Sequence, residues 1–513
     1  GQALVFPYYT VNGGWNTSFS VINTSDTTLA IKVRFHERKN SRDVLDFTLV
    51  MSPYDSWTAW LDDSDEGPVL RTNDNSCTSP TDVDGVAMQR AAYTDRYNDT
   101  GGTGFNRMRE GYLELLVMGE AAGPIIAPPA LWNPAKAMED ETSLYVPYHA
   151  KHVDGVPRNC DIVDMAFLPT TADWLQPPVG VVGMDPTDFG GDLAEDDDSD
   201  DAGGSGDPLA RIDFDAPTVN PLKGNITWTN AASGISAGAS VAAVADWSDI
   251  NMVTAQVFPW FLEPTFASSN GLWTVDGVTD FEDSILSKET LNEWADNPNN
   301  GAATDWVVNF PTKGFHVDKF NEQIQAAVSW YRNSLNDVID CTDDDGEEVP
   351  RKDCQPLADE ADGPTTIAPF EVLFGVGTKG VDSETGLGES PVSVEYHVYD
   401  REENKYSITV DDETTISPAP PRPPLPIDQL RFESNVIQFS AEQSVLDGNQ
   451  PSIIPAGELL ESRSGWVRLE FVGNNADYGL PVSAMMVKVR NTGDSSNSYG
   501  EANENAYIQA EMT

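Results

Sequence analysis

Short apolar segments alternate with turn sequences along the first 61 residues of the chain. The segments span residues 4–11, 17–23, 29–36, 44–51 and 56–61, and Gly, Pro, Asn, Asp and Ser are concentrated between them. Within residues 29–36, Leu29, Ile31, Val33 and Phe35 alternate with Ala30, Lys32, Arg34 and His36. A period of two predicts a strand with one buried face and one solvated face. Evenly spaced strands separated by turns are typical of an antiparallel β-sandwich.

Changes in this pattern divide the chain into five expected regions. They are an N-terminal β-sandwich with long loops at 1–183, an acidic low-complexity loop at 184–209, a mixed β domain at 210–416, a proline-rich linker at 417–426 and a C-terminal β segment at 427–513. Helices are expected near 280–294, 318–335 and, more briefly, 134–138. The stripe of residues 320, 324, 327, 328, 331 and 335 supports the second of these. The expected fold class is mainly β, with Ig-like antiparallel β-sandwich domains, long loops and two or three inserted α-helices.

Charge restricts the partners that the chain can bind. Asp and Glu total 83 against 30 Lys and Arg, a formal net charge of -53. Such a surface repels phosphates, which excludes direct nucleic-acid binding. No apolar run reaches the roughly 20 residues that a membrane-spanning helix needs, so no transmembrane segment is expected. A saline extracellular environment, binding of multivalent cations and a role in solubility remain as explanations of the acidity.

The four cysteines predict two disulfides. None of them forms a CxxC pair, and an even number with wide spacing fits an oxidising compartment. Cys341 is paired with Cys354 because the acidic, proline-containing loop between them closes easily, and Cys77 with Cys160 by elimination. Four free thiols in a cytosolic protein are the alternative. Because the sequence begins at Gly1-Gln2-Ala3 without methionine, we expect an extracellular or cell-surface protein whose signal peptide has been removed, or another cleaved product.

Acidic clusters make calcium the expected cation, although no stretch matches the EF-hand loop. The candidate ligands are Asp62, Asp63, Asp65, Asp196, Asp198, Asp200, Asp343 and Asp345. A solvated acidic surface is the alternative. His149, His152 and Asp154 form a second, weaker candidate, for zinc, and a polar loop is its alternative.

No catalytic residue is predicted. The segment from Gly234 to Gly238 matches the GxSxG pattern around Ser236, but residues 229–233 before it are loop-like, and alternating β and α units are absent from the pattern. A turn of small residues is the preferred interpretation. The 13 Trp residues could fill a β core or bind sugars, and glycosidase carboxylates cannot be chosen among 83 acids without geometry.

The chain begins with an apolar strand that must be covered. Its large side chains are Leu4, Val5, Phe6, Tyr8 and Tyr9. Either the strand joins its own sheet, next to residues 17–23 or the C-terminal strands, or it pairs with a neighbouring molecule. Head-to-tail strand addition of the second kind yields filaments.

Four phrases carry a resemblance to known proteins: residues 6–10, 40–46, 49–55 and 304–312. They resemble segments of uncharacterised, secreted, β-rich proteins of Gram-negative bacteria. That resemblance implies export and a β-rich surface protein, and it contributes no catalytic residue. The preferred hypothesis is a secreted, non-enzymatic structural protein of the cell surface that assembles with itself into a filament or surface layer. The alternative is a secreted carbohydrate-active enzyme or a carbohydrate-binding protein with surface glycans as partners.

Overall fold

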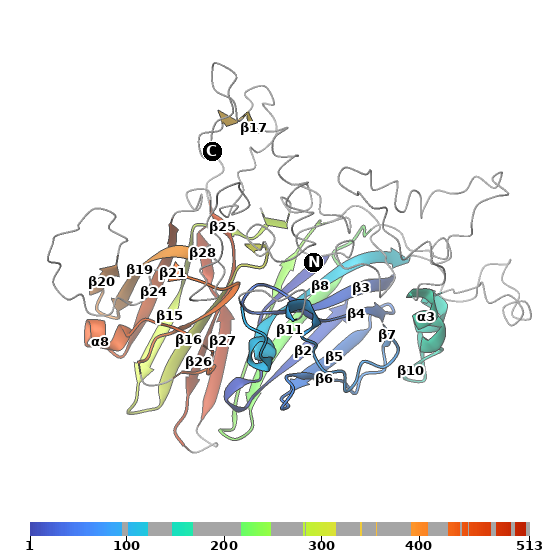
Figure 1. Cartoon of the computed structure of the whole chain (residues 1–513), viewed down its shortest axis with the longest axis horizontal. Helices are drawn as coiled ribbons and strands as arrows, with labels where there is room; N and C mark the ends of the chain where they lie inside the picture. Colours follow the sequence, from blue (N-terminus) through green and yellow to red (C-terminus); the bar gives the residue numbers. More distant parts are fainter. Residues whose placement is uncertain are drawn as a thin grey trace, which may run out of the picture.

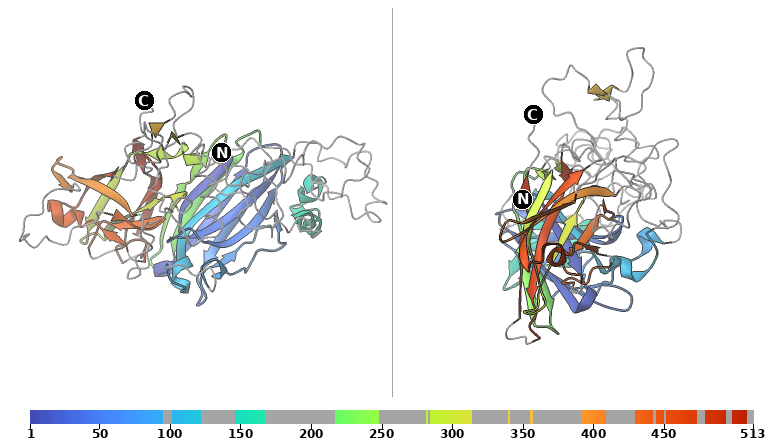
Figure 2. Two further views of the ribbon diagram at one scale, coloured as in Figure 1. Left: turned by 45° about the horizontal axis from the view of Figure 1, so that its top comes forward. Right: turned by 90° about the vertical axis from the view of Figure 1, so that its left-hand side faces the viewer.

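The structure, a computed structural model, describes residues 1–94, 101–121, 146–167, 217–247, 281–313 except 283, 339–340, 355–356, 391–408, 429–441, 444–449, 451–472, 479–493 and 498–508. These residues are mainly β, and their sheets are antiparallel apart from one short parallel pair, which confirms the predicted class. Figure 1 shows two groups of sheets side by side, the blue to green strands of the N-terminal part and the yellow to red strands of the C-terminal part. Figure 2 shows the same arrangement from two further directions.

Two sheets make up the N-terminal group. The first has the order β13-β1-β8-β3-β4-β7, with β13 Ala242–Val244, β1 Ala3–Thr10, β8 Glu110–Ala121, β3 Thr28–Glu37, β4 Asp43–Met51 and β7 Cys77–Ser79. The second has the order β12-β11-β2-β5-β6, with β12 Ile235–Ser240, β11 Leu222–Asn230, β2 Trp15–Asn23, β5 Ser56–Asp62 and β6 Val69–Arg71. Both sheets contribute to one core, in which Phe19 of β2 makes edge-to-face contacts with Phe6 and Phe35 of the first sheet.

The C-terminal group is a sheet folded into two layers that share β15 Glu289–Asn297. The outer layer adds β24 Ser464–Val472, β19 Val392–Asp400, β20 Lys405–Ile408, β21 Gln429–Leu430 and β28 Ala506–Ile508. The inner layer contains β16 Ala302–Asn309, β26 Ser483–Arg490, β27 Tyr499–Glu504, β22 Ser434–Gln438 and β23 Ser452–Ile453. Residues 289–295 of β15 pair with β24, whereas Asp296 and Asn297 pair with β16, so this strand passes from one layer to the other.

The central strands of the inner layer, β16, β22 and β26, are buried on both faces. Trp306 and Val308 of β16 point into a core that the inner and outer layers share, whereas Val307 points into the core of the N-terminal sheets. In β26, Met486 points into the core shared by the inner and outer layers, and Met485 points into the core of the N-terminal sheets. The inner layer therefore joins the two groups of sheets into one continuous body.

The remaining elements are short. The helices are α2 Val146–Ala150, α3 Cys160–Phe167 and α8 Ala456–Leu460, with 3-10 turns η1 Asn12–Gly14, η2 Ala91–Tyr93 and η4 Phe105–Arg109. Small two-stranded pairs are β9 His152–Val153 with β10 Val156–Pro157, β14 Leu286–Ser287 with β25 Leu480–Pro481, and β17 Ile339–Asp340 with β18 Gln355–Pro356. Within the part of the chain that the structure describes, no helix is long and apolar enough to cross a membrane.

The prediction that β3 has a solvated face is wrong. All ten of its residues are buried, including the basic ones. Acidic side chains on the neighbouring strands lie opposite them: Lys32 Nζ is 2.7 Å from Asp46 Oδ2, Arg34 Nη2 is 2.6 Å from Asp43 Oδ2, and His36 Nε2 is 3.0 Å from Glu114 Oε1. A buried charge is tolerated when an opposite charge compensates it, and the alternation of this strand does not reveal that its partners are acidic.

The helix expected near 280–294 is also wrong. Helical turns occur only around Phe281–Ser284, and Glu289–Asn297 is the strand β15. Thr290 and Trp294 of β15 are buried, and the Trp294 indole donates a hydrogen bond to the carbonyl of Tyr399. Pairing with β24 and β16 therefore overrides the local helical tendency. The helices expected at 318–335 and 134–138 lie outside the described residues.

The sheet pairing crosses the expected domain boundary near residue 210. Strands β11, β12 and β13, which were assigned to the domain at 210–416, complete the two N-terminal sheets by pairing with β2 and β1. Gly1 and Leu222 exchange two backbone hydrogen bonds. A sheet partner more than 200 residues away leaves no local sequence signal, so composition alone does not reveal this pairing. The expected acidic loop at 184–209 and linker at 417–426 lie outside the described residues.

Candidate functional site

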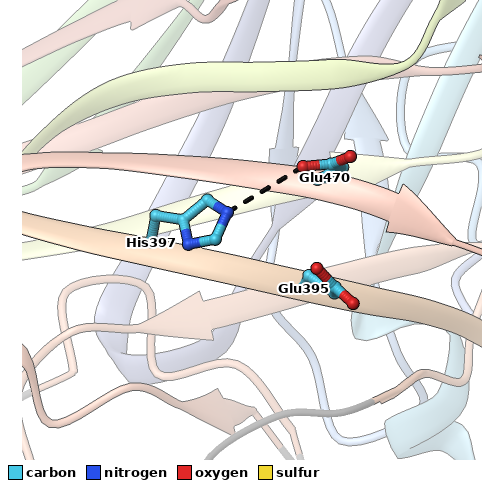
Figure 3. Close-up of side chains that lie close together, drawn as sticks. All are labelled: Glu395, His397 and Glu470. Carbon is cyan, nitrogen blue, oxygen red and sulfur yellow. Dashed lines mark ion pairs between the residues drawn. The ribbon is translucent and has the colours of Figure 1, made fainter. Parts of the chain in front are cut away.

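The outer face of the outer layer carries a cluster of three potential metal ligands, Glu395, His397 and Glu470 (Figure 3). In β19, Val394, Tyr396 and Val398 are buried in the core, so the alternate residues Glu395 and His397 project from the opposite face. Glu395 lies directly opposite Glu470 of β24 in the register. Two adjacent strands therefore position all three side chains, because residues i and i+2 of a strand share a face.

The three ligand atoms lie within 4.8 Å of one another. Nε2 of His397 points toward Glu470 and is 3.9 Å from its Oε2 (Figure 3). This separation is longer than a hydrogen bond. The cluster is thus preassembled by the sheet, and His397 and Glu470 are not hydrogen-bonded to each other.

Arg468 provides the main positive charge next to the cluster. It lies opposite His397 in the register and donates hydrogen bonds to both Glu289 of β15 and Glu470. The hydrogen bond to Glu289 is the largest cause of a raised pKa of Arg468. For His397, burial is the largest cause of a lowered pKa, followed by the charges of Lys405 and Arg468. These effects favour a neutral imidazole, which is the form that binds metal ions.

Two aromatic rings lie on the same face beside the cluster. Tyr399 and Trp466 are cross-strand neighbours, and their rings stack with centroids 3.9 Å apart and an angle of 4° between planes. Trp466 is 38% exposed. The Tyr399 ring also has a cation beside it, because Lys405 Nζ lies 5.6 Å from its centroid. One partly exposed indole next to carboxylates is the kind of surface that sugars contact.

A second polar network, at the junction between the two groups of sheets, is entirely internal. Oδ2 of Asp305, on β16, accepts hydrogen bonds from the hydroxyl of Ser444 and the backbone N–H groups of Val445 and Leu446 at 2.8–2.9 Å. The Trp15 indole of β2 donates to the carbonyl of Val445 at 2.7 Å. Burial raises the pKa of Asp305 to about 6. Because these groups are engaged with one another, the network holds the junction together.

Glu110 extends this network into the first sheet. Its Oε2 accepts a hydrogen bond from the Tyr8 hydroxyl at 2.6 Å, and its Oε1 accepts one from the backbone of Asn449 and lies 3.1 Å from Arg38 Nη1. Burial raises the pKa of Glu110, opposed first by the charge of Arg38. The loop 444–449 is thereby attached to both groups of sheets.

The predicted aspartate ligands that the structure describes do not converge on a metal site. Asp62 accepts hydrogen bonds from Asn16 and Trp60, and Asp63 forms an ion pair with Arg109 at 2.6 Å. Asp65 does not belong to a ligand cluster among the described residues. The other predicted ligands, Asp196, Asp198, Asp200, Asp343 and Asp345, lie outside the described residues, so calcium binding there stays a prediction.

The predicted histidine site is separated by the fold. His149 is buried in α2, whereas His152 lies in β9 and contacts Asn75 Oδ1 at 2.9 Å and Asp55 Oδ2 at 3.6 Å. Asp154 occupies a turn with a positive φ of 55°. Ser236 is an exposed residue of the hairpin strand β12, followed by strand rather than helix, so the structure has no nucleophile elbow at this position.

The disulfide between Cys77 and Cys160 is present, with Cα atoms 5.0 Å apart, and it connects β7 to α3. Cys341 and Cys354 lie outside the described residues. The residues that flank them, Asp340 and Gln355, pair in the two-stranded element β17–β18, and this pairing brings the ends of the intervening loop together. Their disulfide stays a prediction.

The residues proposed for assembly, Leu4, Val5, Phe6, Tyr8 and Tyr9, are all buried in β1. This strand pairs with β8 on one side and with β13 on the other. The intramolecular alternative therefore describes the folded chain, although the partners are neither residues 17–23 nor the C-terminal strands.

Sequence reasoning missed the Glu395, His397 and Glu470 cluster. A weak signal was available: Glu-x-His within an alternating strand places both side chains on one face. The third ligand is 73 residues further along the chain and joins them only through the pairing of β19 with β24. No family model, curated protein or solved structure matches the chain, so the interpretation of this site depends on its geometry.

Proposed function

We propose that this chain is a secreted, non-enzymatic structural protein of the bacterial cell surface, which assembles with itself into a filament or surface layer. The observation that carries the proposal is the inner layer, whose two faces belong to two different cores. A strand layer buried on both sides cannot slide or hinge without exposing apolar surface to water. Such a body is suited to bearing load rather than to closing around a substrate.

The polar junction supports the same proposal. The loop 444–449 is held by Asp305 from the inner layer, by Glu110 from the first sheet and by Trp15 from the second. Buried hydrogen bonds of this kind are costly to break, because a separated donor or acceptor loses its partner without regaining water. They oppose relative motion of the two groups of sheets. We also infer that each packed pair of sheets is a β-sandwich of the Ig-like type, and the shared core of the first two sheets supports this finer description.

Assembly requires an available surface and a means of overcoming charge repulsion. β13 is the last strand of its sheet in the described part of the chain, and an edge strand can pair with a second molecule. β12 also ends its sheet, but it packs against β27 of the same chain. β1 is paired on both sides and would have to leave its own sheet to pair with a second molecule. A net charge of -53 opposes contact between copies, so cations should promote assembly.

The test is sedimentation velocity combined with negative-stain microscopy of the full chain. A concentration series is run in sodium chloride and in calcium chloride of equal ionic strength. Regular polymers that form in calcium support the proposal. A chain that stays monomeric at high concentration in both salts contradicts it. Deleting residues 1–11 serves as a structural control and should unfold the first sheet, because β1 lies between two other strands.

Carbohydrate binding is the second candidate, and one observation favours it. The exposed indole of Trp466 lies beside Glu293 and across from Tyr399 on the outer face. Sugars commonly stack on such rings while carboxylates accept their hydroxyl hydrogen bonds. The test is binding of a panel of polysaccharides by the native chain and by Trp466→Ala. Binding that this substitution abolishes would favour the second candidate, and absence of binding by the native chain would remove it.

A further inference from the structure

The imidazole of His397 is buried without a full set of hydrogen-bond partners. The residue is only 7% exposed, although it belongs to the outward-facing side of β19. Its Nδ1 has no hydrogen-bond partner among the described residues. Its Nε2 points at Glu470, too far away for a hydrogen bond. Nε2 is thus the ring nitrogen that faces the carboxylate of Glu470, and it has no hydrogen bond to it, which leaves this nitrogen available to a bound ion.

The ligand atoms around this imidazole form a chemically selective set. One ring nitrogen and two carboxylates suit zinc and other late first-row divalent ions, whereas calcium takes oxygen ligands only. We propose that Glu395, His397 and Glu470 bind one divalent ion of the zinc type on the outer face of this layer. The proposal concerns a single chain and does not depend on self-assembly.

The geometry is close to that of a three-ligand zinc site. Ligand atoms on a tetrahedral zinc ion lie about 3.3 Å apart, given metal–ligand distances of about 2.0–2.2 Å. The ligand atoms of this cluster lie within 4.8 Å of one another, and His397 Nε2 is 3.9 Å from Glu470 Oε2. Rotation of the two carboxylate side chains closes this difference while both strands stay in register. The three protein ligands leave a coordination position for water.

Arg468 competes with the ion for Glu470. Its guanidinium donates to Glu470 at 3.0 Å and also to Glu289. When Glu470 turns to the ion, Glu289 still pairs with Arg468 and neutralises its charge. Glu289 is therefore a positioning residue, and Glu289→Gln should weaken metal binding although its side chain is not a ligand.

The experiment is calorimetric titration of the full chain with zinc chloride in an excess of calcium, which occupies nonspecific acidic surface. His397→Gln and Glu470→Gln remove ligands. The matched controls are His152→Gln, a histidine outside the cluster, and Glu293→Gln, an outer-face carboxylate paired with Lys488. The native chain and both controls should bind one zinc ion per chain, and each ligand variant should bind at least tenfold more weakly. Circular dichroism of every variant checks that the fold is kept.

A second readout separates histidine ligation from general attraction to acids. Cobalt(II) replaces zinc, and its visible absorption strengthens when an imidazole enters a low-coordinate shell. The native chain should show this absorption, and His397→Gln should lose it. Equal zinc affinity of the native chain and His397→Gln, or a cobalt spectrum that the substitution leaves unchanged, would overturn the proposal.

Discussion

Asp305 should make the stability of this protein depend on pH in a direction opposite to that of an ordinary surface carboxylate. The pKa of Asp305 is raised from 3.8 to about 6 in the folded chain, mainly because burial disfavours its charge. Three hydrogen bonds from Ser444, Val445 and Leu446 oppose this effect only in part. The folded state therefore binds a proton at Asp305 more tightly than the unfolded chain does.

The sign and size of the effect follow from proton linkage. Below pH 3.8 both states carry the proton, and the stabilising contribution of the neutral carboxyl is fully present. It is lost as pH rises through the folded pKa of about 6. The difference between the two pKa values, 3.8 and about 6, corresponds to about 3 kcal/mol of unfolding free energy, at about 1.36 kcal/mol per pH unit.

The perturbation is Asp305→Asn, which keeps the shape of the side chain but cannot ionise. The measured quantity is the difference in unfolding free energy between the variant and the native chain, from urea titrations followed by tryptophan fluorescence. Taking this difference cancels the pH dependence of the other acidic groups. As the pH rises from about 3.5 to about 7.5, the unfolding free energy of the variant relative to the native chain should increase by about 3 kcal/mol.

Two control variants isolate the ionisation. Asp63→Asn removes a half-exposed carboxylate that is paired with Arg109, and as a surface ion pair it should change the unfolding free energy by no more than about 1 kcal/mol. Asp305→Ala removes the acceptor altogether and should destabilise at every pH, by about 2–4 kcal/mol, because two buried backbone donors lose their partner. A difference for Asp305→Asn that is constant across the pH range would refute the reasoning, since the buried carboxyl would then titrate as it does in the unfolded chain.

Three further predictions concern the disulfides and the charge. Replacing Cys77 and Cys160 together by Ser should lower the unfolding free energy by about 4–5 kcal/mol, because the bond closes a loop of 83 residues, and chemical denaturation measures this loss. Peptide mapping without reductant should recover Cys341 linked to Cys354, and free thiols at both positions would contradict that pairing. Calcium should raise the melting temperature more than sodium at equal ionic strength; equal effects of the two salts in differential scanning calorimetry would show that the acidic clusters are only a solvated surface.

The alternation of apolar and polar residues predicted the strands well where one face of the strand is buried and the other is partly exposed. In β2, Phe19 and Val21 point into the core while Ser18 and Ser20 are partly exposed, as a period of two requires. The pattern failed where both faces are buried. Lys32 and Arg34 look like solvent-facing residues in the sequence, but acids from β4 and β8 compensate them inside the protein. The charge that permits their burial belongs to other strands, so no window along β3 contains the information.

The candidate site shows the same limit. The alternation along β19 is sufficient to place Glu395 and His397 on one face. Glu470 becomes their neighbour only because β24 pairs with β19, and the sequence around β19 does not reveal that pairing. The metal ligands that the sequence did indicate were acidic runs and a pair of nearby histidines. Nearness along the chain is a poor guide in a β protein, because adjacent strands bring together residues that are far apart in the sequence.

The local pattern of the sequence was enough to predict the β class and the spacing of the first strands, because side-chain alternation and turn residues are properties of short segments. The pairing of Cys77 with Cys160 was predicted by elimination, and the structure confirms it. Only the tertiary structure decided that β13 completes the sheet of β1, that β16 and β26 are buried on both faces, and that Asp305 is enclosed at the junction. These features depend on which strands pair and in which register. That choice minimises the free energy of the whole core, and it is therefore not encoded at any one position of the chain.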